Sequence, residues 1–179
     1  MDSNRSRAAT LIGVAAAAGA FGVAAMMSAA TAPTARADAF TNIINSVDAD
    51  LGAGQSAFTL AASDFGSNEL APGLAAFFNG LNDDALSAPN TLLIGSVEAL
   101  ANEPITGIEP WGLTAPTDFS DALTNVEAFI SQGEGDFTVA ASDLASGDYG
   151  GAALFGLFGV DAISIAPLEE LLLGAAASL

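Results

Sequence analysis

The chain has 179 residues, of which 21 are Asp or Glu and only three are basic (Arg5, Arg7 and Arg36), and it contains no His and no Cys. A Ser-His-Asp triad and a zinc site of Cys and His ligands are therefore excluded. We expect no enzymatic activity, no bound cofactor or metal, and no nucleic-acid partner, because so acidic a chain repels phosphates.

The first 37 residues have the features of a secretory signal peptide. Two arginines lie near its start, an uncharged Ala-rich stretch covers 8–27, and residues 35–37 read Ala-Arg-Ala. Because this is an Ala-x-Ala cleavage site, we expect cleavage between Ala37 and Asp38 and export by general secretion to the cell envelope or the medium. The alternative is an uncleaved anchor, since about 20 apolar residues can span a bilayer.

Residues 38–179 contain no basic side chain and keep 20 of the 21 acidic ones, because only Asp2 lies in the leader. Side-chain ion pairs are therefore impossible in this part of the chain. The carboxylates are expected on a solvated face, at helix N-termini or beside counter-ions. About half of all residues are hydrophobic, and ten Phe follow the leader, so the composition is not that of a disordered chain.

One segment of the chain occurs twice. Residues 40–65 and 119–144 align without a gap and are identical at 10 of 26 positions. We call two positions equivalent when they are related by the constant offset that takes residue 40 to residue 119. We interpret the chain after the leader as two related units, 38–101 and 119–179. The segment 102–118 between them is rich in Pro and Gly, which is typical of a linker.

Each repeated segment has apolar or small residues at alternating steps of four and three. This spacing places them on one stripe of a helix. Gly54 and Gly133 hold the same position in the stripe, where each weakens a helix by ~1 kcal/mol relative to Ala. Either the glycine allows a second helix to cross closely, or it separates two shorter helices. The pattern favours one long helix in each unit.

Two shorter helices are expected after each long one. In the first unit, Ser67 or Asn68 is a suitable N-cap for a helix that ends near Gly80. A polar turn is expected at 82–84, and Pro89 suits the first turn of the next helix. The second unit should have the corresponding helices at 152–160 and 168–179. The predicted fold is all-α, with two related three-helix units packed as one helical bundle.

The segment from Gly150 to Val160 carries no charge. A helix that is apolar on all sides is either buried or faces a ligand or partner. Burial between the two units is the first interpretation, and an exposed apolar binding face is the alternative. Phe155 and Phe158 are the candidate residues of that face, with Phe158 the one favoured for the core.

Several short phrases point to a group of proteins. The leader ends in Ala-Arg-Ala-Asp, and an acidic body rich in Ala and Gly follows, with Asn-Ser-Val-Asp-Ala-Asp-Leu at 45–51 and Phe-Asn-Gly-Leu at 78–81. In these features the chain resembles small exported proteins of mycobacteria, which implies a cell-envelope or extracellular location and assigns no catalytic residue. The PE and PPE proteins are similar in composition. However, the residue four positions after Tyr149 is Ala153, where their secretion motif has an acidic residue, so we do not expect membership.

The predicted function is a secreted or cell-envelope interaction or structural protein without enzymatic activity. It would bind a protein partner or self-associate. The alternative is a carrier that holds an apolar ligand or lipid between the helical units. A flat apolar face would favour the first function, whereas a carrier needs an enclosed cavity.

Overall fold

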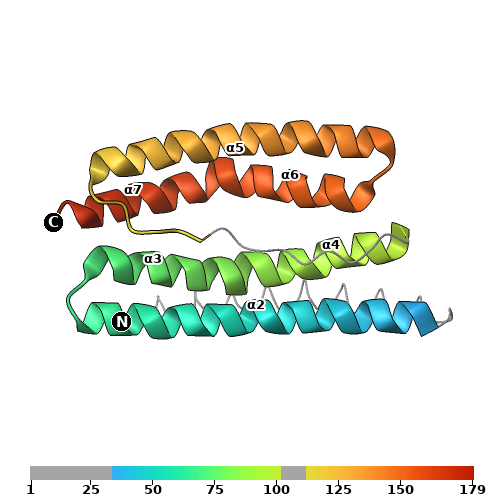
Figure 1. Cartoon of the computed structure of the whole chain (residues 1–179), viewed down its shortest axis with the longest axis horizontal. Helices are drawn as coiled ribbons and strands as arrows, with labels where there is room; N and C mark the ends of the chain where they lie inside the picture. The colour runs from blue at the N-terminus through green and yellow to red at the C-terminus, as the bar shows by residue number, and fades with distance from the viewer. Residues whose placement is uncertain (1–33, 102–111) are drawn as a thin grey trace, which may run out of the picture.

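The structure is a computed structural model, and it describes residues 34–101 and 112–179 (Figure 1). The predicted leader up to residue 33 and the linker segment 102–111 lie outside the described residues. Within the described ranges every regular element is helical, so the all-α prediction is confirmed. The elements are α2 (Thr34–Gly66), α3 (Leu70–Leu81), the π-helical turn η1 (Asn82–Ser87), α4 (Ala88–Ala101), α5 (Phe119–Ser146), α6 (Tyr149–Ser164) and α7 (Ala166–Ala177).

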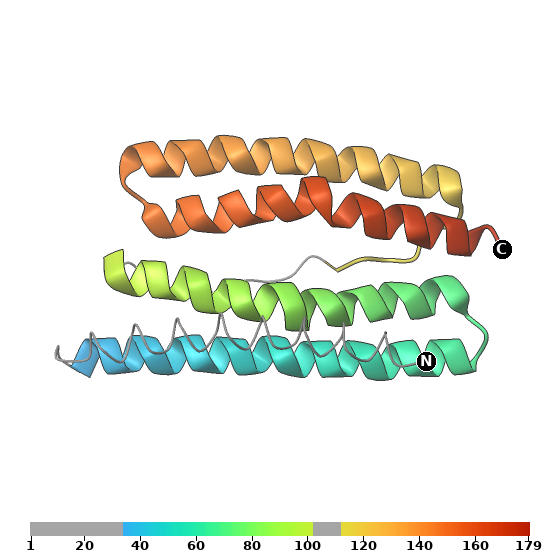
Figure 2. The ribbon, with the colours of Figure 1, turned by 180° about the vertical axis from the view of Figure 1, so that it is seen from behind.

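The described helices form four rods that lie side by side. Their order across the molecule is α2, then α3 with α4, then α6 with α7, then α5, and the view from behind shows the same order (Figures 1 and 2). α2 packs on α3 and α4, and α5 packs on α6 and α7. These are two helical hairpins. They meet along their inner rods, where α4 contacts α6 and α3 contacts α7.

Both long helices are unbroken, as predicted, and the shared glycine marks a close helix crossing. A Cβ atom on Gly54 would overlap the Asp84 carboxylate and lie 3.1 Å from the Gly80 carbonyl oxygen. A Cβ atom on Gly133 would lie 2.9 Å from the Gly159 carbonyl oxygen. Only glycine lets the two backbones approach this closely, and this packing offsets its low helix propensity.

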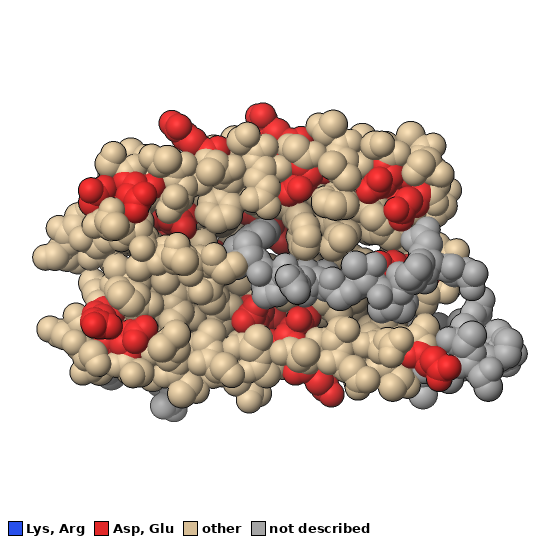
Figure 3. All heavy atoms as spheres, viewed as in Figure 1, with Lys and Arg blue, Asp and Glu red and all other residues tan. Residues whose placement is uncertain are grey.

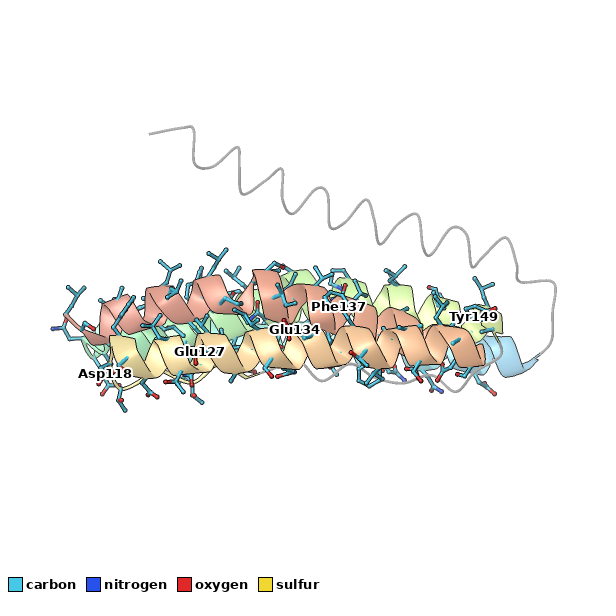
Figure 4. All side chains as sticks on the ribbon, turned by 90° about the horizontal axis from the view of Figure 1, so that it is seen from above. Asp118, Glu127, Glu134, Phe137 and Tyr149 are labelled. Atoms are coloured by element: carbon cyan, nitrogen blue, oxygen red, sulfur yellow. The ribbon has the colours of Figure 1, made fainter. Side chains whose placement is uncertain are left out.

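The same packing contacts occur at equivalent positions of both hairpins. A Cβ on Gly80 would lie 2.8 Å from the ring of Phe58, and one on Gly159 would lie 2.9 Å from the ring of Phe137. In Figure 4, Phe137 lies on α5 beside α6. The other contacts of this kind are Gly95 on Ile43 and Gly174 on Ala122. The aromatic and apolar side chains of the long helices thus pack over small residues of the inner rods.

The two hairpin loops also match. Asn68 and Gly147 occupy equivalent positions and have φ angles of 68° and 86°, the left-handed conformation that closes a helix C-terminus. Because Asn68 closes α2, it cannot cap α3, and the predicted cap at Ser67 or Asn68 is wrong. The N-cap of α3 is Glu69, without a side-chain bond. Its counterpart Asp148 does cap α6, by accepting a hydrogen bond from the Gly151 N–H at 2.8 Å.

In the middle of each inner rod, a proline accounts for the interruption of the regular α-helix. The predicted turn at 82–84 is wrong, because the chain stays helical there through the π-helical turn η1. Pro89 lacks an N–H for the carbonyl of Ala85, so regular α-helical bonding cannot pass this point, and a π-turn accommodates the mismatch. In the second hairpin, Ile165 separates α6 from α7, and Pro167 lies in the first turn of α7. The expected second and third helices therefore follow end to end.

The end of the linker is attached to the seam between the hairpins. Asn79 Nδ2 donates to the Leu113 carbonyl at 2.9 Å, and the Leu113 N–H donates to Asn79 Oδ1 at 2.7 Å. These two bonds hold the Leu113 side chain in an apolar cluster with Ala75 and Leu173. Partly buried side chains complete the cluster: Leu74, Phe78, Ala115 and Phe129. The seam thus has an apolar end that includes linker residues.

Candidate functional site

Acidic side chains are buried in the interior of the molecule. Those below one tenth exposure are Asp50, Asp83, Glu98, Asp161, Glu169 and Glu170. Residues 38–179 contain no Lys, Arg or His that could neutralise them. Burying a carboxylate without a cation is costly, so neutral donors or protons must compensate. The prediction of a solvated position is wrong for these residues, whereas Glu169 does lie in the first turn of a helix, α7.

Two hydrogen bonds cross from one hairpin to the other. Asn82 Nδ2 donates to Glu169 Oε2 at 3.1 Å, and Asn90 Nδ2 lies 3.5 Å from Asp161 Oδ2, a long contact. We call these four residues the acidic seam. Asn82 is equivalent to Asp161, and Asn90 is equivalent to Glu169. The position of Asn82 in the first hairpin thus contacts the position of Asn90 in the second, and the position of Asn90 in the first contacts that of Asn82 in the second, as across a two-fold axis.

Further bonds connect the inner rods to the outer helices. The Thr91 hydroxyl donates to Asp50 Oδ2 at 2.7 Å between α4 and α2. Asn125 Nδ2 donates to Glu170 Oε2 at 3.1 Å between α5 and α7. Thr91 and Glu170 are themselves equivalent positions. In the first hairpin the inner rod therefore carries the donor and the outer helix the acceptor, whereas in the second hairpin the outer helix carries the donor and the inner rod the acceptor. Each of these carboxylates has a neutral side-chain donor.

Burial raises the pKa of Glu169 to about 7, although the Asn82 hydrogen bond opposes this shift. The negative charges of Glu170 and Asp161 raise it further. Burial also raises the pKa of Asp161 and, against the hydrogen bond from Asn125, that of Glu170. Near neutral pH, Glu169 therefore exchanges a proton with solvent, and the seam changes charge where the hairpins meet.

The first hairpin has its own buried acidic group beside η1. Burial raises the pKa of Asp83, and the charges of Asp50 and Asp84 raise it further. Asp84 Oδ1, packed against Gly54, is buried without a hydrogen-bond partner. In the described part of the chain, no group of three or more acidic residues is arranged to hold a metal ion. The chemistry that this arrangement offers is proton uptake and release.

The residues predicted as sites lie elsewhere. Phe155 and Phe158 are half-buried on α6, and their rings meet edge to face with centroids 6.4 Å apart. They lie neither in the fully buried core nor on an open face. Ala37 and Asp38 lie near the start of α2, and Asp38 is exposed. Cleavage between them stays a prediction. The acidic seam could have been found in the sequence, because two Asn of the first unit occupy positions equivalent to two acidic residues of the second.

Large apolar side chains are exposed at matching positions of both hairpins. Figure 3 shows one broad side, where small groups of acidic residues lie among uncharged ones. The exposed pairs at equivalent positions are Leu51 and Ile130, Leu60 and Val139, Phe65 and Leu144, Leu70 and Tyr149, Leu81 and Val160, Leu93 and Leu172, and Leu100 and Leu179. Rods in a row leave such side chains uncovered, since no further helix of the described ranges packs above or below them.

One helical stretch, Tyr149–Ala177, is long and apolar enough to cross a membrane by length and composition alone. Core helices of soluble proteins pass the same test. In this fold the stretch is α6 and α7, which carry the buried Asp161, Glu169 and Glu170 against the first hairpin.

Comparison of the chain with protein-family models, curated proteins and solved structures finds no match. The fold and the seam alone define its class, an all-α protein of two helical hairpins joined through buried carboxylates.

Proposed function

We propose that this is a secreted or cell-envelope interaction protein without enzymatic activity, which binds a protein partner through exposed apolar side chains of its inner rods. The observation that carries the proposal is the exposure of leucines on α4 and α7. Leu93 and Leu100 are 53% and 70% exposed, and Leu168 and Leu172 are 64% and 56% exposed. Contiguous exposed apolar side chains are typical of a protein-binding surface.

Charge determines the kind of partner. Residues 38–179 have 20 acidic side chains and no basic one, so two copies of the chain repel each other at neutral pH. A docking segment that carries Lys or Arg beside apolar residues is attracted by the same charges. A basic amphipathic helix therefore fits this surface better than a second copy of the chain does.

A binding titration with designed peptides tests this function. The probe is a synthetic amphipathic helix of Leu and Lys, and the controls replace either its Lys by Glu or its Leu by Ser. We expect the purified protein to bind the Leu/Lys peptide only, because both charge and apolar contact are needed. Equal binding of the Lys/Ser peptide would reduce the interaction to charge alone and would contradict the proposal.

Two further measurements address the alternatives. N-terminal sequencing of protein recovered from culture medium should give Asp38 as the first residue, as expected for an exported protein with this leader. Light scattering at neutral pH should give the mass of one chain. Lipid released when the purified protein is denatured would favour the carrier function instead.

A further inference from the structure

We infer that the protein presents two equivalent docking surfaces, related by an internal two-fold axis, and so binds two copies of its partner or one symmetric dimer. This inference rests on the proposed function and adds its stoichiometry. The first surface is Leu93, Val97 and Leu100 on α4. The second is made of the equivalent residues, Leu172 and Ala176 on α7 and Leu179 just after its C-terminal end. We call them the α4 surface and the α7 surface.

The seam provides the first evidence for the axis. A two-fold interface requires that, if position i of one copy contacts position j of the other, j also contacts i. Asn82 bonds to Glu169, and Asn90 approaches Asp161, which are the two halves of such a reciprocal pair. The helices obey the same rule, because α3 packs on α7 while α4 packs on α6. The half-turn therefore holds both for helices and for side chains.

The arrangement of the rods gives the direction of the axis. A half-turn in the plane of Figure 1 exchanges α2 with α5 and the α3–α4 rod with the α6–α7 rod. The axis is thus perpendicular to the row of helices. A rotation about such an axis keeps each broad side of the molecule facing the same way. Any surface on one broad side of the first hairpin recurs on the same side of the second.

Each surface is continuous along its helix. Leu93, Val97 and Leu100 are spaced by four and three residues, so they share one face of α4. Leu172 and Ala176 are spaced by four, so they share one face of α7, and Leu179 follows three residues later with 99% of its surface exposed. Leu93 and Leu172 are equivalent repeat positions and nearly equally exposed, at 53% and 56%. The two surfaces therefore offer a partner similar apolar contacts.

The distance between the surfaces favours two separate contacts over one. α4 and α7 lie at opposite ends of the inner rods, with the acidic seam between them (Figures 1 and 2). One docking helix that covers three successive turns of α4 does not reach α7. The occupants are two basic amphipathic segments, supplied by two partner molecules or by the two halves of a symmetric dimer.

Titration calorimetry with the Leu/Lys peptide tests the stoichiometry. The wild-type protein should bind two peptides with similar affinity. The double variant Leu93→Gln with Leu100→Gln should bind one, and so should Leu172→Gln with Leu179→Gln, which changes the equivalent residues. The matched control is Leu60→Gln with Val139→Gln, which changes exposed equivalent residues of α2 and α5 and should still bind two. Helical circular dichroism verifies that every variant is folded.

The outcomes separate the two proposals. Loss of one site in each double variant, and of both in the quadruple variant, supports two equivalent surfaces. A single peptide per wild-type chain, removed by only one double variant, would leave the proposed function standing and overturn this inference. No peptide binding at all would overturn the proposed function. If the wild-type protein binds phosphatidylcholine vesicles and the quadruple variant does not, while both bind the peptide equally, the leucines contact lipid. That result would overturn both the proposed function and this inference.

Discussion

The two hairpins share their packing but differ in the residues that face each other across the seam. The first hairpin has Asn82 and Asn90, and the second has Asp161 and Glu169 at the same repeat positions. Carboxamide donors on one side thus meet acceptors on the other. Two hairpins of the second kind would bring carboxylates face to face, which is repulsive when both are ionised. The difference shows how two similar hairpins can pair with each other in preference to pairing with a second copy of themselves.

A change of core volume should have the largest effect on both hairpins. Ile94 and Leu173 are equivalent positions, and both are completely buried. Ile94→Ala and Leu173→Ala should each lower the free energy of unfolding by about 2–5 kcal/mol, because each removes apolar contacts and leaves a cavity. Leu173 should be the costlier, since it also supports Leu113 of the linker. Urea unfolding measures both.

The adjacent residues provide the matched control for this comparison. Leu93→Ala and Leu172→Ala change exposed leucines next to the buried ones and should alter the free energy of unfolding by at most ~0.5 kcal/mol. Equal losses at buried and exposed positions would show that the rods are not packed as described.

Exchanging donor and acceptor across the seam tests the comparison most directly. Asn82→Asp at about pH 8 should destabilise the protein by roughly 3 kcal/mol, because two buried carboxylates then face each other without a donor. Adding Glu169→Gln should recover most of this loss, since a carboxylate and a carboxamide again form the pair. A double-mutant cycle from urea unfolding gives the coupling. Additive effects of the two changes would exclude direct contact.

The pH dependence of stability near neutral pH should come mainly from Glu169 in the second hairpin. The pKa of Glu169 is raised from 4.5 to about 7 in the folded protein, so folding favours its protonated form. Its contribution is fully present below about pH 4.5 and lost as pH rises through about 7. Glu169→Gln should therefore raise the free energy of unfolding by on the order of 2 kcal/mol at about pH 8 and have little effect near pH 4.5. Thermal melts across this range measure it, with Glu127→Gln as an exposed control. An equal effect for both variants would contradict the role of burial.

Substitution of the glycines of α5 should have the smallest effect on the free energy of unfolding, and the effect should have opposite signs at Gly133 and Gly135. Gly133→Ala introduces a Cβ 2.9 Å from the Gly159 carbonyl oxygen, so we expect a loss of about 1 kcal/mol despite the better helix propensity. Gly135→Ala meets no atom within 4 Å and should gain about 0.5–1 kcal/mol. Chemical denaturation of the two variants shows the sign. A gain at both positions would mean that the crossing of α5 and α6 is looser than described.

The sequence by itself determined the features that depend on neighbouring residues along the chain. The alternation of apolar residues at steps of three and four predicted both long helices, and the shared position of Gly54 and Gly133 allowed a close crossing. Such periodicity is local and survives any packing arrangement. The constant offset between the repeated segments likewise indicated which residues of the two units correspond.

Only the tertiary structure decided how the rods meet and which acidic residues are buried. The sequence predicts a turn at 82–84, but the polar residues there lie in a helix because the second hairpin supplies Glu169 as a partner for Asn82. A carboxylate in a helix is exposed or buried according to the helix that packs beside it. That neighbour lies 87 residues away in this case, and no local pattern specifies it.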